Sequence, residues 1–230
     1  MKRSWTCAAL AGAILMASVG CQQQRESQDA SSRNASSDDE AINVEMKAKI
    51  AEAKANFEKL SPGEKKKLEA QFAKVQNTLP LPLEQAGALS VTRQGKPSST
   101  LASVASPGTP TIIAAWASWC VPCKLEAREL ARLRKEYRPD QLNIAYLNIG
   151  DPKAEAQKGP EFLRQTGAEA LGLTMIDPKE FLKLTRIDQL SVPRVLVYDR
   201  AGNPTEVIAG GLAAGADPRI GQAIRKVVGT

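Results

Sequence analysis

Histidine is absent from the 230 residues of this chain. Its absence excludes Ser-His and Cys-His catalytic pairs, histidine-ligated haem and zinc, and proton transfer through imidazole. Aromatic residues are scarce, at 4%. The formal net charge is +6, but no block of Lys and Arg is dense enough to indicate a nucleic-acid partner. Because histidine is absent, any acid–base chemistry must use Asp, Glu, Lys, Tyr or Cys side chains.

Cysteine is also rare, with four residues at Cys7, Cys21, Cys120 and Cys123. The first two belong to a leader, residues 1–21, whose positive start and apolar run of about 14 residues are typical of a secretory signal. A membrane-spanning helix needs about 20 residues, so this run is short for a span. We therefore expect the functional pair to be Cys120 and Cys123.

The leader ends at residues 17–21, ASVGC, which resemble a bacterial lipobox, with Ser18 where most lipoboxes have leucine. In a lipobox the cysteine becomes the lipidated N-terminus after cleavage, so Cys21 is predicted to carry a lipid anchor. Lipidation supplies several acyl chains, and one chain alone binds a membrane only marginally. The resemblance implies a membrane-anchored lipoprotein of the cell envelope that faces the periplasm. The alternative is an ordinary cleaved signal with an incidental cysteine.

Residues 22–40 contain no aromatic, β-branched or large aliphatic side chain. Such a segment cannot bury enough apolar surface to offset the entropy that is lost when a chain becomes ordered. The composition therefore predicts a flexible linker between the anchor and the rest of the protein.

Residues 41–79 are predicted to form a helical hairpin. Apolar residues recur at steps of three or four in both halves, as on one face of a helix. Between the halves, residues 61–64 (SPGE) have the form of a capping box with proline at the first helical position. Such a hairpin either packs against the main domain for stability or offers a docking surface to a partner or a second copy. The apolar positions are Ile42, Met46, Ile50, Ala53, Phe57, Leu60, Leu68, Phe72, Val75 and Leu79.

Residues 80–230 alternate between apolar runs and amphipathic segments. A continuous apolar run at 111–117 predicts a strand that is buried on both faces. Alternating strands and helices indicate an α/β domain with a mixed central sheet. The other expected strands are 142–149, 171–176, 195–198 and 206–209, with a weak strand or hairpin at 83–101. The expected helices are 124–137, 160–166, 178–185 and 218–228.

Cys120 and Cys123 lie where the buried strand at 111–117 is predicted to lead into a helix. A thiol at a helix N-terminus is favoured in its anionic form by free N–H groups and the helix dipole. The thiolate is the form that attacks a disulfide, so this position supplies a nucleophile without histidine. Cys123 lies about one helical turn further along and can reach back to Cys120. Pro122 is tolerated because it falls in the first turn.

Other uses of a C-x-x-C pair are weaker. Half a zinc site would need two more ligands, and the chain offers neither a second cysteine pair nor histidine. A structural disulfide that closes so short a loop stabilises only modestly. Two thiolates could instead hold Cu(I), so a Cu(I)-binding module for copper-site assembly remains the alternative to redox chemistry. No cofactor is expected.

Residues 116–124, WASWCVPCK, resemble the active site of thioredoxin-fold proteins, and among these the TlpA/ResA-like envelope thiol-disulfide oxidoreductases. The resemblance covers residues 80–230. It extends to Glu126, three residues after the second cysteine, and to Val192-Pro193 before a predicted strand, where members of the family place a cis-proline opposite the dithiol. The resemblance implies a thioredoxin-like fold, with a central mixed β-sheet flanked by helices, preceded here by the helical hairpin.

The chain departs from the family pattern at two positions. Arg128 stands where the family often has a proline that kinks the helix, and Arg194 stands where threonine commonly follows the cis-proline. We expect Arg194 to place a cation near the substrate groove. A peroxiredoxin is excluded because Ala117, not threonine, lies three residues before Cys120. A Sco-type copper protein is excluded because its C-x-x-x-C spacing and its histidine are missing.

Chemistry and resemblance together assign roles to the site residues. Cys120 attacks a target disulfide, and Cys123 resolves the mixed disulfide by forming the Cys120–Cys123 disulfide. Glu126 is the candidate proton acceptor for Cys123 if it is buried; the alternative is a solvated helix residue. Trp119 either packs over the dithiol or serves in the core. Val192 and Pro193, with a cis bond between them, are expected to shape the groove for a substrate backbone.

The predicted function is that of a membrane-anchored extracytoplasmic thiol-disulfide oxidoreductase, working as a protein-disulfide reductase. Strong oxidants of this fold tend to have histidine between the cysteines, and residues 121 and 122 (Val-Pro) offer no such donor. The resemblance implies protein disulfide substrates, such as apocytochrome c or copper-site cysteines, and thus a place in cytochrome c biogenesis or oxidase assembly. It also implies a membrane thiol reductase of the DsbD or CcdA kind as electron donor.

Overall fold

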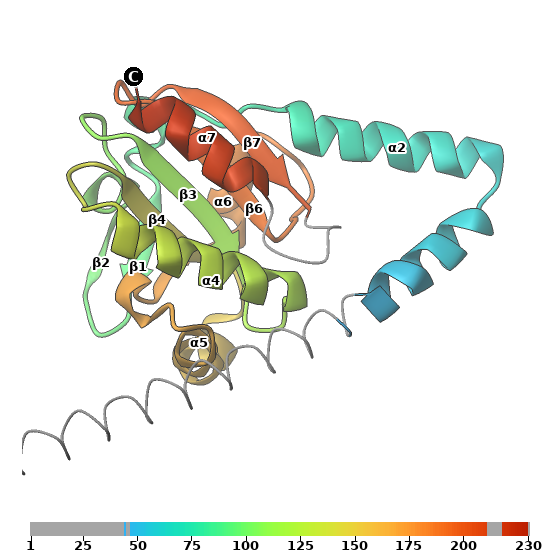
Figure 1. The fold of residues 1–230 in the computed structure, drawn as a ribbon, viewed down its shortest axis with the longest axis horizontal. Helices are drawn as coiled ribbons and strands as arrows, with labels where there is room; N and C mark the ends of the chain where they lie inside the picture. Colours follow the sequence, from blue (N-terminus) through green and yellow to red (C-terminus); the bar gives the residue numbers. More distant parts are fainter. Residues whose placement is uncertain (1–43, 45–46, 211–217, 230) are drawn as a thin grey trace, which may run out of the picture. The chain divides into compact units, whose positions relative to one another are not determined.

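The computed structural model describes residue 44 and residues 47–210 and 218–229 (Figure 1). The predicted signal peptide at 1–21, its lipidated Cys21 and the linker at 22–40 lie outside these residues. The boundaries predicted between the segments of the chain stay predictions. No helix in the described ranges combines the length and the apolarity that a membrane crossing needs.

A seven-stranded sheet runs through the described residues in the order β2-β1-β5-β4-β3-β6-β7. Its middle strand, β3, pairs in parallel with β4 and antiparallel with β6, so the sheet is mixed. All six residues of β3 are buried, as its continuous apolar sequence predicts. The strands are β1 (Ser90–Arg93), β2 (Ser98–Thr100), β3 (Thr111–Trp116), β4 (Asn143–Asn148), β5 (Thr174–Ile176), β6 (Arg194–Tyr198) and β7 (Pro204–Ala209).

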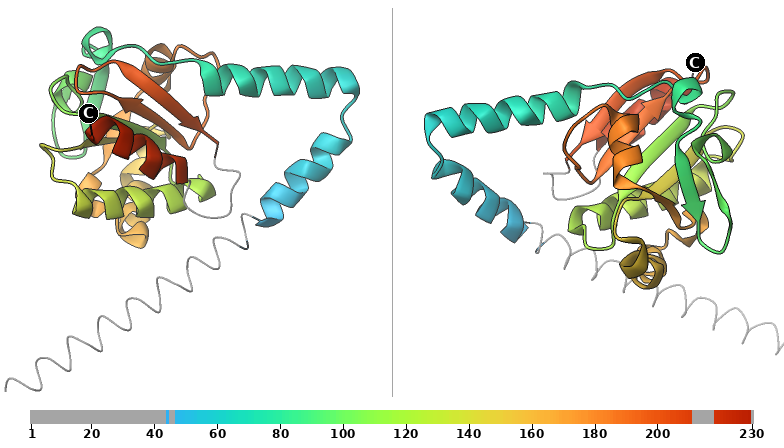
Figure 2. Two further views of the ribbon diagram at one scale, coloured as in Figure 1. Left: turned by 45° about the horizontal axis from the view of Figure 1, so that its top comes forward. Right: turned by 180° about the vertical axis from the view of Figure 1, so that it is seen from behind.

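Helices cover both faces of the sheet and bury a separate apolar cluster on each. On one face, α4 (Val121–Glu136) and α7 (Pro218–Val228) contribute Leu130 and Ile224 to the larger cluster (Figure 1). On the other face, α6 (Pro178–Thr185) contributes Phe181, and α3 (Leu83–Ala86) also packs there (Figure 2). The remaining helical elements of the body are α5 (Pro152–Thr166) and the short 3-10 turns Leu101–Ser103 and Glu169–Leu171. The predicted central mixed sheet flanked by helices is thus confirmed.

The helix after β4 is longer than predicted. The sequence predicts only a short helix at 160–166. The structure begins α5 at Pro152, with Asp151 as the N-cap, whose carboxylate accepts a hydrogen bond from the Ala154 N–H at 2.9 Å. Pro160 lies inside this helix. The true start signal was therefore an Asp-Pro pair, in which proline occupies the first helical position.

Two helices precede the sheet domain in the described part of the chain. Residues 47–58 form the first, and α2 (Pro62–Asn77) the second. The predicted capping box is present: the Ser61 hydroxyl accepts from the Glu64 N–H, and the Glu64 carboxylate accepts from the Ser61 N–H at 2.8 Å. Helix α2 buries none of its residues. That residues 41–79 form a helical hairpin as one unit stays a prediction.

Candidate functional site

Strand β3 delivers the two cysteines to the N-terminus of α4. Cys120 is the N-cap of this helix, and its N–H donates to the Ala117 carbonyl at 3.0 Å. The two sulfur atoms form a disulfide of 2.07 Å, with Cα atoms 5.3 Å apart. The predicted strand-to-helix position of the C-x-x-C pair and the Cys120–Cys123 disulfide are both present in the structure.

The two sulfur atoms have different environments. Cys120 is 4% exposed and its Sγ accepts a hydrogen bond from the Cys123 N–H at 3.3 Å, whereas Cys123 is fully buried. In the reduced protein, this N–H and the dipole of the 16-residue helix α4 would stabilise a thiolate on Cys120. The geometry thus suits Cys120 as the attacking sulfur and Cys123 as the resolving one.

The peptide bond between Val192 and Pro193 is cis, as predicted. In the sheet, Arg194 of β6 pairs with Ala115 of β3, so Pro193 lies level with Trp116, where β3 ends and the dithiol loop begins. The Pro193 carbonyl accepts from the Gly210 N–H at 3.2 Å, which ties this loop to the end of β7. The cis-proline therefore lies beside the dithiol, as the groove hypothesis requires.

Trp119 is 66% exposed, which excludes a core role. Its side chain lines a cavity together with Val192 and Ile149, and it also borders a second cavity that includes Lys124. Trp119 and Val192, both predicted to bind substrate, thus belong to one surface beside Cys120.

Glu126 is buried on α4, with 6% of its surface exposed. The solvated-residue alternative is therefore wrong for this position. Burial and, secondarily, the charge of Glu126 hold the pKa of Tyr146 well above its usual value. The Tyr146 hydroxyl donates to the Cys123 carbonyl at 3.5 Å, so the carboxylate, the phenol and the resolving cysteine share one buried region. The role of Glu126 as proton acceptor for Cys123 stays a prediction.

Arg194 does not place a cation in the groove, and this expectation is corrected. The side chain is fully buried, and its Nη2 lies 3.5 Å from the Thr78 carbonyl, just after α2. Along β6, Val195 and Val197 join the cluster that holds the two cysteines, while Leu196 and Tyr198 join the opposite cluster. Side chains alternate along a strand, so Arg194 falls on the side away from the dithiol.

Replacing Arg194 by methionine is expected to raise the free energy of unfolding by about 1–2 kcal/mol at pH 7. Burial lowers the pKa of the Arg194 guanidinium to about 10, so folding disfavours its charged form. This penalty is fully present below pH 10 and disappears as the pH rises toward the unfolded pKa, so the advantage of methionine should shrink above pH 10. Urea unfolding of both proteins at pH 7 and pH 11 measures it. A clear loss of stability at pH 7 would show that the bond to Thr78 outweighs desolvation.

Sequence reasoning missed a buried carboxylate, Glu155 on α5, which is 1% exposed. It accepts hydrogen bonds from the Ser118 backbone N–H at 3.2 Å and from the Ser118 hydroxyl at 2.8 Å. It also accepts from the Asn148 side-chain amide at 2.8 Å, and Asn148 in turn accepts from the Gly150 N–H at 2.8 Å. Because Ser118 lies two residues before Cys120, this network fixes the dithiol loop to β4 and α5. The only sequence signal was the Asp151-Pro152 helix start, which would have put Glu155 in the first helical turn.

Aromatic stacking fixes the end of β3, from which the dithiol loop continues. The Trp116 ring stacks on Tyr146 with centroids 4.9 Å apart and on Phe162 with centroids 4.5 Å apart. These three residues come from β3, β4 and α5, so the stack joins the strand that carries the dithiol to its neighbours.

Among the described residues, no group of three or more His, Cys, Asp or Glu side chains is placed to hold a metal ion.

A known protein similar to this chain is a thiol-disulfide oxidoreductase. The chain is 28% identical over 98 residues to the thiol-disulfide oxidoreductase ResA of Geobacillus kaustophilus (strain HTA426), which is 41% of this chain and 51% of that protein. It thus spans about half the length of this relative. The predicted resemblance to ResA is thereby confirmed. No protein-family model matches the chain.

Solved structures show the fold. The crystal structure of a thiol:disulfide interchange protein of the thioredoxin family from Chlorobium tepidum TLS matches with a TM-score of 0.50 and 18% identity. The match covers 65% of this chain and 97% of that one. This similarity, together with the mixed sheet and its flanking helices, identifies the fold as thioredoxin-like.

Proposed function

We propose that the chain is a thiol-disulfide oxidoreductase that reduces protein disulfides through Cys120 and Cys123. The observation that carries the proposal is the pair of cysteines at the N-terminus of α4, beside the cis Val192–Pro193 bond. The similarity to ResA supports it. Helix N-terminus, dithiol and cis-proline together provide a nucleophile, a resolving thiol and a surface for a substrate backbone.

The reaction proceeds by two exchanges. The Cys120 thiolate attacks one sulfur of the substrate disulfide, a mixed disulfide forms, and the other substrate sulfur leaves as a thiolate that takes up a proton. The Cys123 thiol loses its proton, for which Glu126 is the proposed acceptor, and attacks Cys120. The second substrate thiol is released and the Cys120–Cys123 disulfide remains. Two electrons pass from the dithiol to the substrate, so a dithiol donor must reduce the protein again.

The cellular setting is part of the same proposal. A leader that ends at Cys21 supports a lipid-anchored protein in the cell envelope, facing the periplasm. A membrane thiol reductase of the DsbD or CcdA kind would supply the electrons there. The proposed substrates are disulfides of partner proteins such as apocytochrome c or copper-site proteins. No observation on the described residues favours the alternative, a Cu(I)-binding module, over redox chemistry.

The reduction potential of the Cys120–Cys123 couple tests the proposed direction. The protein is equilibrated with mixtures of reduced and oxidised glutathione or dithiothreitol, and the fraction of dithiol is measured by alkylation. A potential near that of thioredoxin, about −270 mV, is expected of a reductase. A potential near that of DsbA, about −120 mV, would identify an oxidant and reverse the proposal.

A further inference from the structure

Exposed apolar side chains gather beside the dithiol. Among the described residues, five large hydrophobic side chains are exposed, and Phe72, Trp119 and Leu190 line one cavity of about 340 Å³. Phe72 is 55% exposed and Leu190 is 41% exposed. Single exposed apolar residues are ordinary, but several around one cavity mark a binding surface.

The cavity has one wall from outside the thioredoxin-like fold. Leu68, Phe72 and Val75 of α2 form this wall, and Trp119 and Val192 beside the dithiol face it. Helix α2 has an apolar stripe at helical spacing but buries none of its residues. Its stripe therefore contributes little to a core, and its apolar side chains remain available to a ligand in the cavity.

Two contacts hold the helices at 47–77 against the thioredoxin-like domain. Lys74 of α2 forms an ion pair of 2.7 Å with Asp188, in the segment that also lines the cavity. Ile50, in the preceding helix, packs on Val121 and Leu125 in the first turns of α4, next to Cys120. These two contacts together place the α2 wall beside the dithiol.

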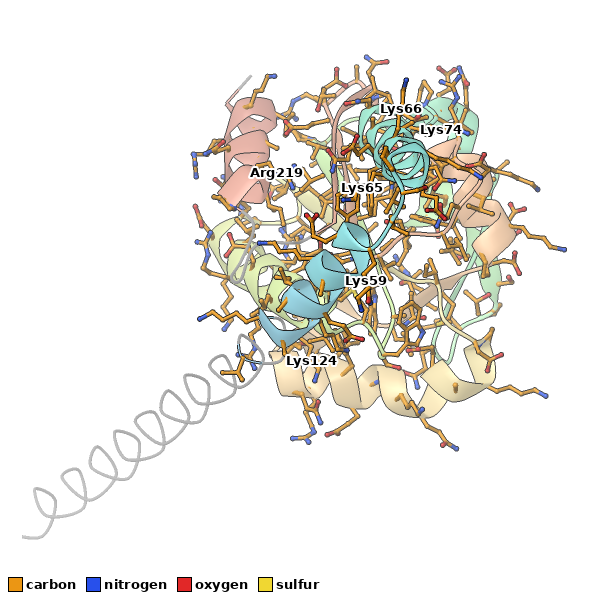
Figure 3. The ribbon with its side chains drawn as sticks, turned by 90° about the vertical axis from the view of Figure 1, so that its right-hand side faces the viewer. Lys59, Lys65, Lys66, Lys74, Lys124 and Arg219 are labelled. Carbon is orange, nitrogen blue, oxygen red and sulfur yellow. A yellow bond between two sulfur atoms is a disulfide. The ribbon has the colours of Figure 1, made fainter. Side chains whose placement is uncertain are left out.

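Positive charge predominates on the two helices that precede the sheet domain, one of which forms the cavity wall. Residues 47–77 contain eight lysines and four glutamates. Lys65 pairs with Glu58, but Lys59, Lys66 and Lys124 form no ion pair within the described part of the chain. A partner of opposite charge would be drawn to this face and oriented on it. Figure 3 shows Lys59, Lys65, Lys66, Lys74, Lys124 and Arg219 on one side of the molecule.

We propose that this groove binds an extended polypeptide of the substrate protein, with an apolar side chain in the cavity and acidic residues next to the reactive cysteine. The proposal rests on the proposed function, because the substrate cysteine must reach Cys120. Helix α2 then acts as a specificity wall: its apolar residues bind the side chain, and the lysines of the two helices at 47–77 select acidic flanks. The redox chemistry itself is unchanged, so small disulfides should react without using the groove.

Two disulfide-linked peptides test the proposal with the full chain. They share one apolar sequence around the cysteine and differ only in having glutamate or lysine flanks. Reduction of bis(2-hydroxyethyl) disulfide, which is small and neutral, is the reference reaction. We expect kcat/KM to be about tenfold higher for the acidic peptide than for the basic one, and the preference to weaken as salt is added.

Charge-reversed variants locate the effect. Lys59→Glu combined with Lys66→Glu should abolish the preference and leave the reference reaction unchanged. The matched control, Lys96→Glu with Lys226→Glu, changes the net charge equally in the β1–β2 turn and the last turn of α7, and should keep the preference. In the apolar part of the groove, Phe72→Ser should lower kcat/KM about fivefold for both peptides but not for the reference disulfide.

Each contrary result has its own meaning. If the chain does not reduce the reference disulfide, the proposed function fails. If it reduces that disulfide but treats both peptides alike, or if the control variant acts like the Lys59/Lys66 variant, the groove proposal alone is overturned. If Phe72→Ser instead dissociates a dimer on size-exclusion chromatography and leaves peptide kinetics unchanged, the groove takes a second copy of this chain.

Discussion

Replacing Cys120 by serine should reduce the rate of protein-disulfide reduction by at least about a thousandfold, the scale of loss when a covalent nucleophile is removed. A serine hydroxyl stays protonated at neutral pH even at a helix N-terminus, so no mixed disulfide can form. The change is small, and the N-cap role of position 120 is kept, because serine is a preferred N-cap residue. The measurement is insulin reduction by the full chain with dithiothreitol as donor.

The matched variant is Cys123→Ser, which keeps the attacking sulfur and removes the resolving one. It should accumulate a mixed disulfide between Cys120 and the substrate, visible as a higher-mass species on non-reducing gels. If Cys120→Ser traps substrate and Cys123→Ser does not, the two cysteines have exchanged roles. Undiminished turnover by Cys120→Ser would mean that the dithiol is not the reacting group.

Replacing Glu155 by alanine should lower the free energy of unfolding by about 3 kcal/mol, because the buried donors of Ser118 and Asn148 lose their acceptor. Such a loss is a large part of the 5–15 kcal/mol that a domain typically has. Disulfide reduction should fall with it, since the loop that precedes Cys120 loses its attachment to α5. Urea unfolding and insulin reduction measure the two effects.

The conservative change Glu155→Gln separates charge from structure. Glutamine keeps one acceptor oxygen, so we expect it to recover part of the stability and turnover. Loss of the buried negative charge should also favour the Cys120 thiolate, so that iodoacetamide alkylates the reduced protein about threefold faster at pH 7. A looser loop would speed alkylation by the same factor at every pH, whereas an electrostatic influence also shifts the pH at which alkylation begins to lower values. Slower alkylation of the glutamine variant would therefore contradict an electrostatic influence of Glu155 on the dithiol.

The chemistry of the site could be predicted from the sequence because it depends on residues that are adjacent in the chain. An apolar strand, a C-x-x-C pair and a helix-forming segment follow one another directly, so the dithiol falls at the N-terminus of α4 without any long-range contact. The bounds of α6 and α7 were also predicted correctly, since Pro178 and Pro218 mark helix starts. The cis bond at Pro193 was predicted by family resemblance and not by any local pattern.

What sequence reasoning missed depends on tertiary structure. Glu155 lies 37 residues from Ser118, and nothing near it in the sequence shows that its carboxylate is buried. The direction of Arg194 follows from the register of β6 against β3, which places alternate residues on opposite faces. The cavity beside Trp119 combines α2 with the cis-proline loop, two segments that the sequence keeps more than 100 residues apart.

The buried carboxylate also restricts which sequences can maintain this site. A β-carbon at Gly150 would lie 2.4 Å from the Glu155 carboxylate oxygen, well inside van der Waals contact. Any side chain at position 150 would therefore displace the group that holds the dithiol loop. Changes at these two positions cannot be independent, and the energetic effects of substituting both should be strongly non-additive. Gly150 lies outside the C-x-x-C motif, yet it must remain glycine for Glu155 to keep its position and hold the dithiol loop.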